Sequence, residues 1–274
     1  MKRDTVKSTV VLILIFVPSV VFYPGNTLGG NSAKTDNPTK RSFIENGEPN
    51  LGAIIKYIDD MYRSKSSISS LKLIVTKPRN KRTLTMKTWT KGEEKVLVII
   101  EAPPREKGTA TLKIERNLWN YLPRIRRTIR IPPSMMLTSW MGSDFTNDDL
   151  VHEASLQKDY DYSLIGRSAD PNGWLIELKA RPDIVGLWKK LEVIVSEDGR
   201  VPLLARYYDR KGRLARILFY SDVKNFDGHI IPSKLALIPE DKKGNKTELI
   251  YEDIDFDVPV PDLTFSLSNL ERKK

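Results

Sequence analysis

The chain has 274 residues, of which 40% are hydrophobic and 29% are charged, so it can bury a core, and this length suits one principal β domain. Its 45 Lys and Arg residues outnumber 35 Asp and Glu residues, and the net charge of +10 favours an anionic partner such as lipid headgroups, an acidic protein or nucleic acid. The absence of cysteine excludes disulfides, thiolate metal sites and a cysteine nucleophile.

The N-terminal segment, residues 1–24, has the pattern of a secretory signal peptide. Lys2 and Arg3 precede an apolar run over Val10–Val17 that continues to Phe22. An uncleaved anchor is the alternative, because no clear small-x-small cleavage site follows the run. Either form predicts export to the periplasm. Export argues against nucleic acid as a partner and leaves lipid headgroups or acidic proteins as the better candidates.

Residues 25–49 are rich in Gly, Asn, Ser, Thr, Lys and Pro, which predicts a flexible linker before a domain over residues 50–274. The domain begins with the clearest helix of the chain, over residues 51–62. Asn50 is placed to cap its first turn. Its apolar residues recur at helical spacing on one face: Leu51, Ile54, Ile55, Ile58, Met61 and Tyr62.

The rest of the domain consists of short alternating runs of strand-forming residues separated by turn residues. The predicted strands are residues 71–76, 82–89, 96–101, 109–114, 117–122, 124–131, 160–165, 174–180, 191–196, 203–209, 214–221, 229–237 and 247–251. Glycine-containing pairs such as Asn172 and Gly173 are predicted as hairpin turns. Links this short require antiparallel neighbours, and so many strands should curl into a barrel, a half-barrel or a sandwich.

The predicted strand over residues 124–131 has two different faces. Alternation places Ile125, Ile129 and Ile131 on one side and three guanidinium groups on the other, those of Arg124, Arg126 and Arg130. Such a face could line a cavity mouth and pair with phosphate or carboxylate headgroups. The alternative is the solvated outer face of a half-buried strand.

The segment after this strand is unusually apolar for a loop. It contains Met135, Met136, Trp140 and Met141, and Phe145 follows a short turn. Unbranched thioether side chains adapt to ligands of variable shape, so the loop could act as a gate or plug for an acyl-chain cavity. Alternatively, it simply packs over one end of the core. Further on, the spacing of Thr146 and Asp149 fits a capping box and predicts a short helix.

The strings LWNYLPRIRRTIR and SWMGSDFTNDDLV, together with residues 67–75 and the turn over residues 89–92, resemble the outer-membrane lipoprotein-sorting protein family. That family belongs to a superfamily of periplasmic lipoprotein carriers and outer-membrane receptors. The resemblance covers most of residues 50–270. It implies a mainly β fold in which a strongly curved antiparallel sheet forms an unclosed half-barrel, with helices lidding its concave face around a hydrophobic cavity.

The resemblance also implies the ligand and the partners. The expected ligands are acyl chains of a lipoprotein or another lipid, and an inner-membrane transporter or outer-membrane receptor is the expected partner. The helix over residues 51–62 fits as a lid, although its apolar stripe is also what any core helix needs. The best-known carriers are shorter and lack the SWMGSDF string, so the resemblance alone does not assign their particular substrate to this chain.

Catalytic and cofactor signals are weak. His152 and His229 lie far apart and outside any metal-ligand spacing, and Ser143 is not in a G-x-S-x-G motif. The acidic residues near Asp148 are explained by helix capping more simply than by a cation site. No nucleotide-binding fingerprint occurs. We therefore expect no enzyme activity, no metal and no cofactor.

Three functions remain to be weighed: a lipid or lipoprotein carrier, which the sequence favours, an envelope sensor domain of the same fold that binds a protein, and a hydrolase. Co-purified lipid would favour the first and a stoichiometric protein partner without lipid the second, while substitution of His152 without any change of phenotype would remove most of the case for the third. The candidate cavity and gate residues of the carrier are Trp119, Tyr121, Arg124, Arg126, Arg130, Met135, Met136, Trp140, Met141 and Phe145.

Overall fold

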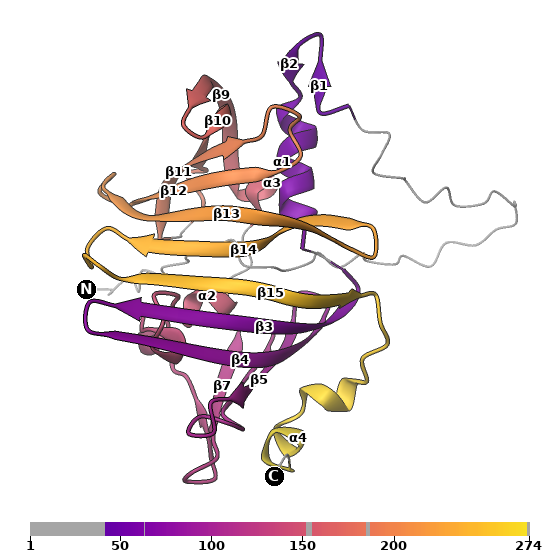
Figure 1. Ribbon diagram of the computed structural model, residues 1–274, viewed down its shortest axis with the longest axis vertical. Coiled ribbons are helices and arrows are strands. Elements are labelled where there is room, and N and C mark those ends of the chain that lie inside the picture. The colour runs from indigo at the N-terminus through magenta and orange to yellow at the C-terminus, as the bar shows by residue number, and fades with distance from the viewer. Residues whose placement is uncertain (1–41, 63, 152–154, 185–186, 273–274) are drawn as a thin grey trace, which may run out of the picture.

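The structure is a computed structural model that describes residues 42–62, 64–151, 155–184 and 187–272. A 13-stranded antiparallel sheet dominates it, in the order β8-β7-β6-β5-β4-β3-β15-β14-β13-β12-β11-β10-β9 (Figure 1). The strands are β3 (Ser66–Lys77), β4 (Asn80–Lys91), β5 (Lys95–Ala102), β6 (Ala110–Ile114), β7 (Asn117–Leu122), β8 (Arg127–Arg130), β9 (Tyr160–Ala169), β10 (Asn172–Ala180), β11 (Trp188–Val195), β12 (Pro202–Asp209), β13 (Leu214–Phe226), β14 (His229–Pro239) and β15 (Lys246–Phe256). The predicted strands and their antiparallel pairing are confirmed.

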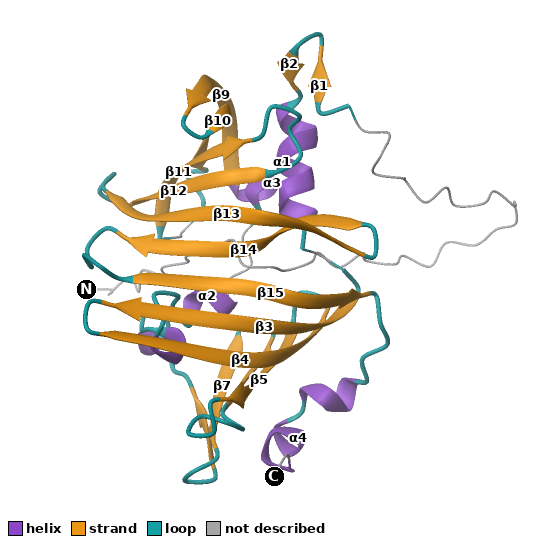
Figure 2. Ribbon diagram, in the orientation of Figure 1, coloured by secondary structure: helices purple, strands orange, loops and turns teal. Residues whose placement is uncertain are grey.

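The sheet bends strongly and does not close (Figure 2), so the half-barrel prediction is also confirmed. Strands β3 and β15 pair at its centre, while β8 and β9 form its two edges. The chain therefore winds outward from β3 to β8, crosses to the opposite edge, and winds back from β9 to β15. The described parts of the crossing segment, residues 131–151 and 155–159, lie along the concave side and place the loop with the SWMGSDF string there.

Helices cover the concave side. Helix α1 (Leu51–Asp60) buries Ile54, Ile55 and Ile58 in the main core, and the Asn50 side chain caps it by accepting a 3.0 Å hydrogen bond from the Ala53 amide, as predicted. Short helices α2 (Asp148–Val151) and α3 (Leu156–Asp159) lie in the crossing segment, together with the 3₁₀ turns η2 (Pro133–Met135) and η3 (Trp140–Gly142).

Helix α1 also holds helix α3 in place. The two carboxylate oxygens of Asp59 accept hydrogen bonds from the Ser155 hydroxyl at 2.7 Å and the Leu156 amide at 3.0 Å. These contacts satisfy donors at the first turn of α3, where a carboxylate is electrostatically favoured. The lid elements are therefore tied to one another as well as to the sheet.

The opposite face of β5 to β7 has a core of its own. Leu97, Ala110, Leu112 and Tyr121 pack there against Val260 and against residues of η4 (Asp262–Phe265) and α4 (Leu267–Arg272). The C-terminal segment thus covers the convex side of this wing of the sheet (Figure 1). Strand β5 therefore has buried apolar side chains on both faces, with Val98 in the main core and Leu97 in this second core.

The structured domain extends further toward the N-terminus than residue 50. Strands β1 (Ile44–Glu45) and β2 (Glu48–Pro49) form a small hairpin, and Phe43 is buried against Tyr57 with ring centroids 5.0 Å apart. The predicted linker is therefore wrong at its C-terminal end. The predicted signal peptide and the rest of the linker lie outside the described residues. Among the described residues, no helix is long and apolar enough to span a membrane.

Gly173 lies inside β10 rather than in a turn, which corrects the sequence prediction. The turn is at Asp170 and Pro171, and a Cβ atom on Gly173 would lie 2.2 Å from the backbone oxygen of Val195 on β11. Only a residue without a side chain allows this approach.

We expect Gly173→Ala to lower the free energy of unfolding by about 2–3 kcal/mol, because β11 must move away from the new methyl group. Gly52→Ala in helix α1 is the matched control, since its Cβ would meet nothing closer than 3.6 Å. Urea unfolding of both variants checks this. Equal stability of the two variants would contradict the close approach.

Candidate functional site

The concave face contains an apolar cavity of about 80 Å³ between β3, β4, β5, β15 and the crossing segment. Its described lining residues are Tyr62, Ser67, Ser69, Leu71, Met86, Thr88, Thr90, Val96, Val98, Trp140, Phe145, Asp149, Leu150, Leu249, Tyr251, Ile254 and Phe256. An apolar cavity of about 150 Å³ holds one benzene molecule. The space therefore admits a whole acyl chain only if part of its wall moves.

Two of the wall residues come from a compact loop over residues 139–146. Ser139 and Thr146 form a β-bridge at its base, and the Trp140 amide donates a 2.8 Å hydrogen bond to the Phe145 carbonyl. This geometry directs the Trp140 and Phe145 side chains into the cavity, where both are buried. The buried Trp140 ring donates from Nε1 to the Thr111 hydroxyl on β6 at 3.1 Å. We call residues 139–146 the plug.

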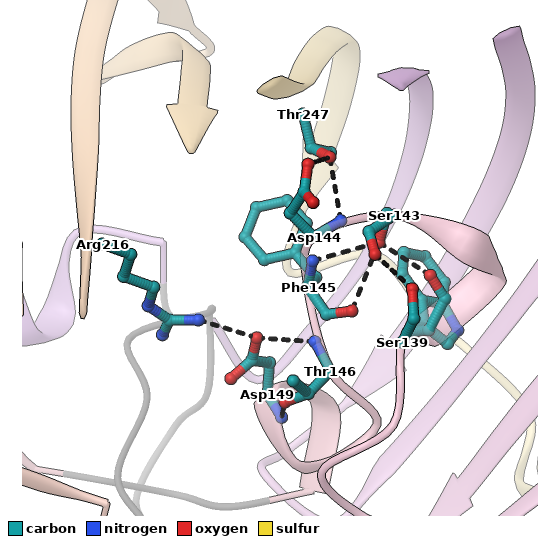
Figure 3. A network of polar contacts seen from close by, with 9 residues as sticks. Ser139, Ser143, Asp144, Phe145, Thr146, Asp149, Arg216 and Thr247 are labelled. Carbon is teal, nitrogen blue, oxygen red and sulfur yellow. Dashed lines mark hydrogen bonds and ion pairs between the residues drawn. The ribbon is translucent and has the colours of Figure 1, made fainter. Parts of the chain in front are cut away.

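Polar contacts at the rim hold the plug against the sheet (Figure 3). The Asp144 amide donates to the Thr247 hydroxyl at 2.9 Å, and that hydroxyl donates to the Asp144 carboxylate at 2.7 Å. Asn245 donates to the other carboxylate oxygen at 2.9 Å. Arg82 on β4 donates to the Met141 carbonyl. The plug thus presents apolar side chains to the cavity, and hydrogen bonds at the rim attach its outer side to the sheet.

A buried ion pair fixes the segment that follows the plug. The Thr146 amide donates to Asp149 Oδ2 at 2.8 Å and the Asp149 amide donates to the Thr146 hydroxyl at 3.2 Å, which confirms the predicted capping box. Arg216 Nη1 on β13 lies 3.0 Å from Asp149 Oδ2 (Figure 3). Burial raises the pKa of the Asp149 carboxyl, although the Arg216 charge opposes this.

Aromatic rings surround the Arg216 guanidinium. Its central carbon lies 4.5 Å from the Trp188 ring centroid and 4.7 Å from that of Tyr207. The side chain is buried, and among the described residues its Nε and Nη2 atoms find no hydrogen-bond partner. The position of Arg216 in an otherwise ordinary alternating strand gave no indication of this role in the sequence.

The structure places the ten predicted site residues in three different regions. Trp140 and Phe145 line the cavity. Met141 packs against the main core from within the plug, Met136 packs against a small cluster around Leu118, and Met135 is exposed. The apolar loop therefore contributes its aromatic residues, rather than its methionines, to the cavity wall.

Trp119 and Tyr121 lie on the other face of the sheet. They pair with Leu112 and Ala110 on β6, and they belong to the core under the C-terminal segment. Neither is among the residues that line the cavity. Their prediction as cavity residues is therefore corrected by the geometry: alternation placed them correctly on one face but did not identify which face is concave.

The arginine strand was also predicted too long. Strand β8 begins at Arg127, and Arg124 and Arg126 lie in the β7–β8 turn, where Arg126 has a φ of 50°. Arg124, Arg126 and Arg130 are all exposed, and none of them lines the apolar cavity. Arg124 instead borders an open groove with Arg82 and Arg105. This corrects the predicted guanidinium face at a cavity mouth.

Several residues that shape the cavity carried no clear signal in the sequence, among them Thr88 on β4 and Tyr251 on β15. Thr88 is 7% exposed and Tyr251 is 3% exposed, and neither hydroxyl has a hydrogen-bond partner among the described residues. Burial raises the pKa of the Tyr251 phenol, so this hydroxyl stays protonated. Only the register between strands shows that both residues face the cavity.

The residues considered for catalysis do not form a common site in the part of the chain that is described. His229 stacks on Phe256 with centroids 4.0 Å apart, while the Ser143 hydroxyl donates within the plug to the Trp140 carbonyl at 2.7 Å. His152 lies outside the described residues. No described group of three His, Asp or Glu side chains is arranged to hold a metal ion.

Comparisons with known proteins agree on the fold. A protein-family model with the description "-like: Uncharacterized protein" matches residues 92–272. A DUF1329 family protein from Desulfovibrio piger is 24% identical with a TM-score of 0.71, over 84% of this chain and 100% of that one. A putative outer membrane lipoprotein-sorting protein domain from Vibrio parahaemolyticus is 23% identical with a TM-score of 0.67, over 79% and 96%.

A third structure, of a LolA superfamily protein from Nitrosomonas europaea, is 23% identical with a TM-score of 0.64, over 79% of this chain and 97% of the other. A search of curated protein sequences finds no significant match. The three solved structures are thus aligned over nearly their whole length.

Proposed function

Because the chain belongs to the protein family matched over residues 92–272 and has the fold of outer-membrane lipoprotein-sorting proteins, we propose that it is a periplasmic carrier of acyl chains. Its ligand is a lipoprotein or another lipid, which it shields from water on the way to the outer membrane. A membrane transporter or receptor supplies or accepts the ligand. The resemblance inferred from the sequence is confirmed at the level of the fold.

The observation that supports this proposal is the plugged apolar cavity. The described cavity wall is apolar except for a few hydroxyl groups and Asp149, and the plug contributes two buried aromatic side chains to it. An acyl chain that replaces Trp140 and Phe145 exchanges one apolar surface for another. Burying the chain gains about 0.8 kcal/mol per methylene group removed from water. The free energy of plug withdrawal is offset by this gain.

The net charge supports the route of delivery. With an excess of ten basic residues, the chain is attracted to the anionic headgroups of a membrane surface, where acylated ligands are found. The exposed arginines of the β7–β8 turn contribute to this attraction without lining the cavity. These arginines attract the protein to the membrane surface, whereas the cavity binds the acyl chain.

Lipid extraction tests the proposal. The full chain is purified from a periplasmic fraction without detergent and denatured in organic solvent, and the extract is analysed by mass spectrometry. Acylated lipid or lipoprotein in stoichiometric amount is expected. A stoichiometric protein partner without lipid would favour the envelope sensor instead, and would overturn the carrier proposal.

A further inference from the structure

The strand register gathers four small hydroxyl side chains at one end of the cavity. Ser67 pairs with Thr90 and Ser69 pairs with Thr88 across β3 and β4. The next pair along the same face, Leu71 with Met86, is apolar. Because paired residues share a face, the concave surface changes from hydroxyl-bearing to hydrocarbon within one pair of residues.

Two of the hydroxyl groups that face the cavity are free to donate a hydrogen bond. Ser67 and Thr90 satisfy each other, with their hydroxyl oxygens 2.7 Å apart. By contrast, Thr88 Oγ1 and Tyr251 Oη are buried and find no partner among the described residues. Buried hydroxyls normally have a hydrogen-bond partner, because a buried hydroxyl without one is energetically unfavourable. A carbonyl group of a ligand in the cavity would supply this acceptor.

The charges of the wall limit what that acceptor can be. The described lining residues include no Lys, Arg or His, and their one carboxyl group is that of Asp149. Asp149 Oδ1 is itself buried without a hydrogen-bond partner among the described residues. A carboxylate ligand would have to be desolvated beside an acidic group that already occupies the Arg216 cation, and no lining residue supplies a second cation, which is unfavourable.

We propose that Thr88 and Tyr251 select acyl ligands that end in an uncharged ester or amide carbonyl, and that the cavity rejects free fatty acids. The carbonyl oxygen accepts a hydrogen bond from the Thr88 or the Tyr251 hydroxyl, and the hydrocarbon chain lies toward Leu71, Met86 and Leu249 in the space that the plug vacates. This inference rests on the proposed carrier function and specifies its substrate class.

Three ligands of equal chain length test the inference: methyl hexadecanoate, hexadecyl methyl ether and hexadecanoate. Each is offered to the full chain in phosphatidylcholine vesicles, and the transferred amount is measured after the vesicles are removed. The ester is expected to bind about three- to tenfold more tightly than the ether, as one or two hydrogen bonds allow. The carboxylate is expected to bind more weakly than the ester.

Isosteric variants identify the residues responsible. Thr88→Val and Tyr251→Phe should each reduce the preference for the ester, and ether binding should fall less than ester binding because the ether oxygen is the weaker hydrogen-bond acceptor. Thr85→Val, on the opposite face of the same strand, is the matched control and should retain the preference. Three results would overturn this inference but not the carrier function. They are equal binding of ester and ether by the unaltered chain, an unchanged preference in both variants, and tighter binding of the carboxylate than of the ester. Failure of all three ligands to bind would instead overturn the carrier function on which it rests.

Discussion

Oxidising a cysteine pair introduced by Asp144→Cys and Thr247→Cys is expected to reduce acyl-chain uptake at least about tenfold, because a covalent bond removes the plug-withdrawn state from the population. The Thr247 hydroxyl lies 2.7 Å from the Asp144 carboxylate, so the two side chains are in direct contact. The chain has no cysteine of its own, so this disulfide has no competitor.

The same protein with reductant is the control for this experiment. Reduction should restore uptake, since the plug is then held only by the remaining hydrogen bonds at its rim. Uptake is measured with an acyl ligand delivered from vesicles, after loss of free thiols has confirmed the bridge. If fully bridged protein took up ligand as fast as reduced protein, the plug would not be the gate.

The second large effect concerns the buried ion pair. Arg216→Met is expected to lower the free energy of unfolding by about 3–5 kcal/mol, because it leaves the buried Asp149 carboxyl without its cation. The pair is almost fully enclosed, with 6% of the Arg216 side chain and 1% of the Asp149 side chain exposed. Arg167→Met, which breaks the exposed pair of Arg167 with Glu197, should lower the free energy of unfolding by less than about 1 kcal/mol.

The double variant Arg216→Met with Asp149→Leu shows whether this effect arises from the pair. Removing both charges should recover most of the stability lost in Arg216→Met, since neither partner is then left buried alone. Chemical denaturation of the two single variants and the double variant gives the coupling energy. Additive losses would mean that Arg216 stabilises the fold through its packing on Trp188 and Tyr207 instead.

The sequence predicts the strands well because each strand has its own local signals. Alternating apolar residues bounded by turn residues located every strand of the sheet, and Asn50 marked the start of helix α1. Gly173 was wrongly assigned to a turn. A glycine is needed there because the backbone of Val195 on the neighbouring strand approaches too closely for a side chain. Local chemistry cannot distinguish that use of glycine from a turn.

The candidate site was less predictable, because alternation assigns residues to a face but not to the concave one. On β6 and β7 both faces are covered, one by the C-terminal segment, so Tyr121 is buried and Trp119 partly buried on the face away from the cavity. The plug could be recognised because apolar residues in a loop are unusual. Arg216 and Thr88 could not be recognised, since their environment depends on strands that are distant in the sequence.

The central claim is that an acyl chain occupies the concave cavity after the plug withdraws. Photochemical cross-linking measures this directly, with a lipid ester that carries a diazirine at the end of its acyl chain and is delivered from vesicles. Peptide mass spectrometry should locate the label on the cavity wall, at residues such as Leu71, Met86 and Leu249. Label on the convex core around Leu97 and Leu112, or no specific label at all, would contradict the claim.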